Sequence, residues 1–191
     1  MKLLALAIAT LATTSLIAGQ YVGISGGADY AHHTDSEKGE KIGYKVGATY
    51  GYKFSNGFRG EFELAYRDGQ KRTLYVYSDG GADAKTHESR HSISYLVNVS
   101  YDIAGLATYG ITPFVGAGVG LCCNSYETKT QMGRDVTNRD KGNEDRFAWQ
   151  LIAGAKYPIA DQLELAGEYK YFNGDYHAKN HSFSAALIRS F

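Results

Sequence analysis

Apolar and polar residues alternate one by one between Lys41 and Arg67, a stretch that reads KIGYKVGATYGYKFSNGFRGEFELAYR. Every second residue from Ile42 to Phe54 is apolar or aromatic, and the residues between them are Lys, Gly or Thr. Successive side chains of a β-strand point to opposite faces, so a period of two predicts strands. The sequence Ser55-Asn56-Gly57 predicts a tight turn, because Asn-Gly accepts positive φ angles. The stretch therefore predicts an antiparallel hairpin, although the alternation alone does not identify its buried face.

The same alternation recurs along the rest of the chain and predicts about eight strands in all. The other six are expected at 21–30, 91–103, 111–121, 146–157, 163–172 and 180–191. Short connections (55–57, 104–110, 158–162) alternate with long ones (31–40, 68–89, 124–145, 173–179). All the short connections then lie at one end of the sheet, as in barrels with tight periplasmic turns and long external loops. The expected fold class is all-β, an eight-stranded antiparallel transmembrane β-barrel.

Three features of the two faces favour an apolar exterior and a polar interior. The polar face is rich in glycine, as at Gly47 and Gly118, which suits a narrow lumen filled by long side chains from other strands. The apolar face keeps its few charges near strand ends, and its aromatic residues gather near turns. A soluble barrel with an apolar lumen is the alternative. The predicted interior charges are Lys45, Arg59, Glu61, Glu63, Lys156, Glu164, Glu168 and Lys170.

Composition agrees with an exported β-protein. The chain has 16 Tyr, 8 Phe and 23 Gly against 2 Pro, a balance typical of strands and turns rather than helices. Residues 1–19, MKLLALAIATLATTSLIAG, combine a Lys, an apolar run and small terminal residues, which predicts a secretory signal peptide followed by a barrel domain at 20–191. A retained N-terminal anchor is the alternative. The formal net charge is zero, so no nucleic-acid partner is expected.

Two motifs, PFVGAGVG (113–120) and FAWQLIAGAKYPIADQLELAGEYKYF (147–172), carry a family resemblance. The chain resembles the bacterial outer-membrane β-barrel superfamily that includes the opacity proteins and the OmpA transmembrane domain. The resemblance implies an eight-stranded barrel in the outer membrane of a Gram-negative bacterium, often exposed to a host. It also implies a C-terminal signature that the barrel-assembly machinery reads, matched here by Phe183, Ala185, Leu187 and Phe191, whereas Arg189 departs from it.

The adjacent cysteines Cys122 and Cys123 sit where the fifth predicted strand meets a long connection. Neighbouring α-carbons are too close for an ordinary structural bridge. Free thiols, a vicinal bridge and an intermolecular disulfide are the alternatives for this pair.

Other candidate chemistry is sparse, and no catalytic, cofactor-binding or metal site is expected. His181 and Ser182 are adjacent, so they point to opposite faces of a strand and make no catalytic pair. His32 and His33, near Asp35 and Glu37, lack a confirming set of metal ligands.

The segment Lys71–Ser78, KRTLYVYS, is itself strand-like although it lies in a long connection. We expect the third and fourth strands to project from the membrane as a hairpin whose edge is open to a partner strand; a disordered loop is the alternative.

These features predict an outer-membrane surface protein without enzymatic activity, a scaffold whose external loops serve adhesion, host interaction or envelope integrity. The expected partners are outer-membrane lipid, the barrel-assembly machinery and host surface molecules, and no cofactor is expected. A small pore and an outer-membrane lipid-modifying enzyme are the alternatives.

Overall fold

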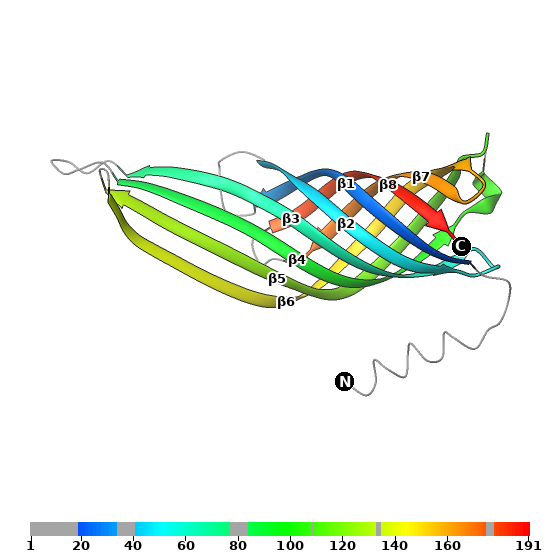
Figure 1. Cartoon of the computed structure of the whole chain (residues 1–191), viewed down its shortest axis with the longest axis horizontal. Coiled ribbons are helices and arrows are strands. Elements are labelled where there is room, and N and C mark those ends of the chain that lie inside the picture. The colour runs from blue at the N-terminus through cyan, green and yellow to red at the C-terminus, as the bar shows by residue number, and fades with distance from the viewer. Residues whose placement is uncertain (1–18, 34–40, 77–83, 108, 133–134, 175–177) are drawn as a thin grey trace, which may run out of the picture.

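The computed structural model describes residues 19–33, 41–76, 84–107, 109–132, 135–174 and 178–191 (Figure 1). The predicted signal peptide falls largely on residues 1–18, outside this range, so it stays a prediction. The strands are β1 (Gly19–His33), β2 (Lys41–Lys53), β3 (Phe58–Val76), β4 (Ala84–Asp102), β5 (Thr112–Met132), β6 (Asp135–Ala160), β7 (Leu163–Asn173) and β8 (Ala178–Ser190), with one short 3-10 helix, η1 (Ala104–Leu106).

The eight strands form a closed barrel in which each strand pairs antiparallel with its neighbours in sequence. β1 pairs with β8 from Tyr21↔Ser190 to His33↔Ala178 and so closes the sheet. The predicted all-β, eight-stranded antiparallel barrel is therefore confirmed. No helix among the described residues is long and apolar enough to cross a membrane.

Tight connections lie at one end of the barrel, which we call the turn end. In the first, Phe54 donates its amide to Phe58 O (2.8 Å) and Gly57 adopts φ +88°, a left-handed conformation that glycine accepts without strain. Asn56 Oδ1 accepts the Phe58 amide at 3.2 Å. The Ser-Asn-Gly segment thus turns the chain because glycine accepts the positive φ and the Asn side chain accepts a backbone hydrogen bond within the turn.

The opposite end, which we call the loop end, differs from the sequence-based expectation. β3, β4, β5 and β6 extend well beyond β1, β2, β7 and β8 (Figure 1). The expected loop at 124–145 is mostly strand, because β5 continues to Met132 and β6 begins at Asp135. That expectation was wrong because both faces of these segments are polar, so hydrophobic alternation gave no signal for the strands.

The apolar face of the strands points outward and the charged face points inward. Val46 and Phe62 are each 48% exposed on the outer wall, whereas Lys45 and Glu63 are fully buried in the lumen. Glycine makes this interior possible: a side chain at Gly118 would overlap Asn98, and one at Gly51 would overlap the Tyr21 ring. The exterior is therefore an apolar wall around a filled, polar lumen.

Candidate functional site

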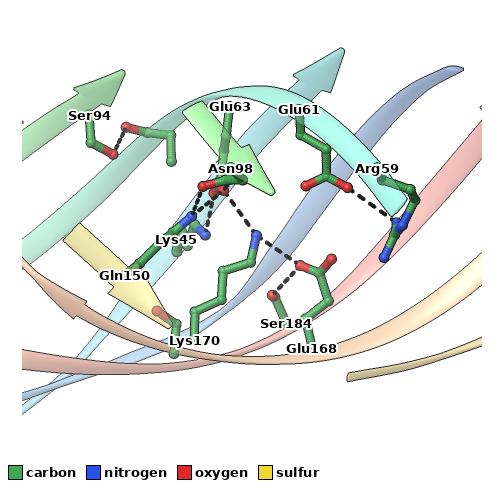
Figure 2. Close-up of polar contacts among 12 residues, drawn as sticks. Lys45, Arg59, Glu61, Glu63, Ser94, Asn98, Gln150, Glu168, Lys170 and Ser184 are labelled. Atoms are coloured by element: carbon green, nitrogen blue, oxygen red, sulfur yellow. Dashed lines mark hydrogen bonds and ion pairs between the residues drawn. The ribbon is translucent and has the colours of Figure 1, made fainter. Parts of the chain in front are cut away.

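One carboxylate at the centre of the lumen binds side chains from four other strands (Figure 2). Glu63 of β3 lies 2.7 Å from Lys45 Nζ of β2 and 3.1 Å from Lys170 Nζ of β7. Its Oε2 also accepts hydrogen bonds from Asn98 Nδ2 of β4 (3.0 Å) and Gln150 Nε2 of β6 (2.8 Å). All five side chains are buried. Glu63 therefore ties together strands that are far apart in sequence.

A second ionic cluster lies between this centre and the turn end. Lys156 Nζ of β6 lies 2.7 Å from Asp102 Oδ2 of β4 and 3.3 Å from Glu164 Oε2 of β7. Arg59 of β3 reaches Asp102 at 3.1 Å and Glu61 at 3.2 Å. Lys53 Nζ of β2 also lies 3.5 Å from Asp102 Oδ2, so three cations meet three carboxylates, which is what charges removed from water require.

A third group lies toward the loop end. The Arg67 guanidinium stacks 3.7 Å from the centroid of the Phe172 ring, and its Nη1 donates to Ser94 Oγ at 2.7 Å. Asp29 Oδ1 lies 4.0 Å from Arg67 Nε and accepts a hydrogen bond from Ser182 Oγ at 2.8 Å. Arg67 and Asp29 thus form an ion pair in the part of the lumen nearest the loop end.

Two apolar clusters border the ionic groups inside the barrel. Tyr21, Phe114, Ile152, Ala166, Ala186 and Ile188 pack toward the turn end, and Leu96, Cys122, Ala148 and Phe172 pack toward the loop end. Sequence reasoning missed both clusters, although the larger side chains at Phe114, Phe172 and Ile188 interrupt the polar parity and offered a signal. The lumen is therefore filled along its length by paired charges and apolar side chains.

The sequence-predicted interior charges all come together in these groups. Glu168 lies 3.1 Å from Lys170 Nζ, which also contacts Glu63, and Glu61 also accepts a hydrogen bond from Tyr21. Figure 2 shows Lys45, Glu63 and Lys170 converging from separate strands into the lumen. What the arrangement can do chemically is limited, because each of these charged groups lies against an opposite charge.

The outer wall carries aromatic side chains at both ends of its apolar zone. Phe58 and Tyr101 are in contact near the turn end, with ring centroids 4.9 Å apart. Trp149 and Tyr171 pair at 5.4 Å nearer the loop end. Such belts mark the two interfaces of a membrane with water.

The residues predicted as an assembly signal lie on this outer wall. Phe183, Ala185 and Leu187 of β8 are exposed, and Phe191 is 67% exposed. Arg189, which departs from the signature, lies with its guanidinium 5.9 Å from the Phe191 ring centroid. Recognition of these residues by the assembly machinery stays a prediction.

The two cysteines point to opposite sides of β5. Cys122 is fully buried, with its thiol 3.5 Å from Asn124 Oδ1, whereas Cys123 is partly exposed on the outer side. Neither cysteine is joined in a disulfide in this single chain. An intermolecular disulfide stays a prediction, and this placement assigns it to Cys123, because the buried Cys122 is inaccessible to a second chain.

His181 and Ser182 lie on opposite sides of the β8 wall. His181 Nδ1 is 2.7 Å from Tyr169 Oη, and Ser182 is buried against Asp29. The part of the chain that the structure describes holds no group of three or more His, Cys, Asp or Glu arranged for a metal ion. Asp35 and Glu37, considered with His32 and His33 as possible metal ligands, lie outside the described residues.

The four extended strands form a projecting sheet at the loop end, made of 71–76 of β3, 84–90 of β4, 126–132 of β5 and 135–142 of β6. The segment Lys71–Ser78 was predicted to be strand-like, and β3 pairs with β4 as far as Val76↔Ala84. The β4–β5 and β5–β6 ladders continue to Ala84↔Met132 and Met132↔Asp135. The projection is thus a four-stranded sheet rather than a lone hairpin.

Comparison with known proteins agrees with this geometry. The family model described as "Outer membrane protein beta-barrel domain" matches residues 2–191. Outer membrane protein PagN of Salmonella typhimurium is 32% identical over 81 residues, covering 42% of this chain and 33% of that protein. An uncharacterized protein of Brucella abortus is 31% identical over 146 residues, covering 69% of this chain and 51% of that protein. The chain thus spans between a third and half of the length of these relatives.

Solved structures share the fold at low sequence identity. Neisserial surface protein A has a TM-score of 0.64 and 15% identity, with 92% of this chain and 100% of that chain covered. Ail, the attachment invasion locus protein of Yersinia pestis, solved in complex with the heparin analogue sucrose octasulfate, has a TM-score of 0.58 and 10% identity over the same shares. Identities this low support a common fold alone.

Proposed function

This chain belongs to the outer membrane protein β-barrel domain family, and from that premise we propose that it is a non-enzymatic surface protein that attaches the bacterium to host molecules. It lies in the bacterial outer membrane, with the turn end in the periplasm and the loop end outside the cell. The proposal places the binding activity on the projecting sheet and the external loops, and assigns the barrel the role of an anchor.

The projecting sheet is the observation that carries the proposal. Four strands continue past the ends of β1, β2, β7 and β8, so nearly thirty residues are ordered outside the lipid zone. Ordered external structure of this kind serves contact with something outside the cell rather than insertion. The shared fold with Ail, which is named for attachment and invasion, is consistent with adhesion.

The alternative functions have less support. A channel requires an open lumen, whereas Glu63, Lys45, Lys170 and Gln150 fill the centre of this one. A lipid-modifying enzyme requires a nucleophile and base on the lipid-facing wall, and His181 and Ser182 point to opposite sides of it.

The decisive experiment removes the projecting sheet and keeps the barrel. In one variant, Asn-Gly turns join Gly69 to Arg90 and Glu127 to Lys141, which are paired positions across adjacent strands. Complementing a deletion strain with this variant should restore the folded barrel, detected by its heat-modifiable gel mobility, but not attachment to host cells or survival in serum. Attachment equal to that of the full-length protein would contradict the proposal.

A further inference from the structure

A tyrosine ring lies across the inner face of the projecting sheet, at its base above the lumen. Tyr126 of β5 shares the parity of the buried Cys122, and it pairs with Gly142 of β6, which shares the parity of the buried Gln150. Both positions therefore belong to the face that continues the lumen wall. A side chain at Gly142 would overlap the tip of the Tyr126 ring, yet Tyr126 is 41% exposed. The glycine thus makes room for an aromatic surface that water still reaches.

An exposed ion pair stands beside this ring on the same face. Arg146 donates to Glu144 Oε2 from both Nη2 (2.7 Å) and Nε (3.2 Å), and the Glu144 side chain is 53% exposed. Glu144 Oε1 takes part in neither bond. Glu144 follows Gly142 by two positions on β6, so it is the diagonal neighbour of Tyr126 across the ladder, a spacing that long side chains bridge. A planar acceptor and a planar donor therefore lie next to the aromatic ring.

These three side chains have the chemistry that recognises a sugar. The face of an aromatic ring is negative, and a hexopyranose presents to it a face of C–H groups with partial positive charge. Neighbouring hydroxyl groups of the sugar both donate and accept, so a carboxylate and a guanidinium side by side match them with charge-assisted hydrogen bonds. Because Glu144 and Arg146 already hold each other, binding orders them at little further cost. The pair has no net charge, which favours a neutral sugar over a sulfated or sialylated one.

The inner face is reached from outside the cell rather than from the membrane. Pairing of β6 with β7 ends at Trp149↔Asn173, well before Gly142, so β5 and β6 stand above the ends of β7 and β8 here (Figure 1). The glycolipid of the bacterium itself stands beside the outer wall, on the opposite side of the sheet. A sugar that meets the Tyr126 ring therefore arrives from the cell exterior.

We propose that Tyr126, Glu144 and Arg146 form a binding site for a neutral hexopyranose unit of a host-cell oligosaccharide. The ring stacks against the C–H face of the sugar, Glu144 accepts hydrogen bonds from its hydroxyl groups, and Arg146 donates to them. This inference goes beyond the attachment proposed above, because a sugar site at the base of the sheet stands or falls separately from what the rest of the sheet contacts.

The test measures sugar binding by the full chain in phosphatidylcholine nanodiscs, which contain no sugar of their own. The labelled protein is applied to a glycan array that carries neutral, sialylated and sulfated oligosaccharides. Tyr126→Ala removes the ring, and Gly142→Val displaces it without removing a polar group. Asn143→Ala is the matched control, because Asn143 is exposed on the same strand but points to the opposite face. Heat-modifiable mobility checks that each variant is folded, and Glu144→Ala replaces any ring variant that is not.

The unaltered protein should bind neutral oligosaccharides, and Tyr126→Ala should lower its affinity for them about tenfold or more, as truncation of a central aromatic contact does. Gly142→Val and Glu144→Ala should also weaken binding, whereas Asn143→Ala should leave it unchanged. The proposal would be overturned by an array on which no neutral oligosaccharide is bound, by equal binding of Tyr126→Ala, or by binding confined to sulfated or sialylated oligosaccharides. Host-cell attachment, measured with the variant that lacks the outer part of the sheet, tests the adhesive function separately.

Discussion

At the residue scale, Glu63 is the side chain on which the lumen depends most. Glu63→Gln leaves Lys45 buried without its carboxylate partner. Lys170, the other cation bound to Glu63, still has Glu168 as a partner. Removing one member of a buried ion pair costs about 3–5 kcal/mol. We expect unfolding of the Glu63→Gln variant in urea, followed by tryptophan fluorescence in lipid vesicles, at a clearly lower midpoint than that of the unaltered protein.

The double variant Lys45→Gln with Glu63→Gln is the matched control for this prediction. It removes both charges of the pair and leaves Lys170 bound to Glu168. Part of the lost stability should return relative to Glu63→Gln alone. A double variant less stable than the single one would show that charge pairing is not what Glu63 supplies.

The outer wall gives the opposite prediction about charge. Val46 and Leu64 are 48% and 42% exposed on the lipid-facing side, near the middle of the apolar zone. A Lys at either site should cost about 2–4 kcal/mol near the membrane midplane. Refolding yield of Val46→Lys into phospholipid vesicles should drop, whereas Val46→Leu should refold normally. Normal insertion of the Lys variant would mean that this face does not meet lipid.

Cys123 is the thiol expected to form any disulfide between chains. Non-reducing electrophoresis of outer membranes should show a cross-linked band that Cys123→Ser abolishes and Cys122→Ser preserves, because Cys122 is fully buried. A purely monomeric pattern would exclude the cross-link.

At the scale of the element, the projecting sheet should behave as ordered structure. β3 pairs with β4 between Lys71↔Ser89 and Val76↔Ala84, so its amides are held by a strand ladder outside the lipid zone. Hydrogen exchange read by mass spectrometry should show protection of residues 71–76 above that of the exposed η1 turn. Exchange as fast as in the η1 turn would instead favour a disordered loop in this segment.

At the scale of the whole molecule, the filled lumen predicts a barrel that does not conduct ions. Glu63 and Lys45 are fully buried at its centre, and apolar clusters lie toward each end. Planar bilayers containing the refolded protein should show no large, stable conductance, while a sixteen-stranded porin in the same bilayers should conduct. A steady conductance that appears with the protein and is absent from protein-free controls would require the channel function to be reconsidered.

The sequence was sufficient for the barrel because its determinants are local. Alternation at Ile42–Phe54 distinguishes the two faces of one strand, and Asn56-Gly57 closes one hairpin without reference to the rest of the chain. The alternation of polar with apolar residues likewise identifies Lys45, Glu63 and Lys170 as residues of the inner face of their strands. What local pattern leaves open is which of these side chains meet, because that depends on register and barrel closure.

By itself, then, the sequence determined the number of strands, their order and the side of the wall on which the residues of the predicted strands lie, since a period of two records the contrast between lipid and lumen. Only the tertiary structure decided that Glu63 binds Lys45, Lys170, Asn98 and Gln150, because the five come from strands brought together by closure. It also decided that β5 and β6 project outward as strands. With water on both faces there is no hydrophobic contrast, and strand pairing alone orders these segments.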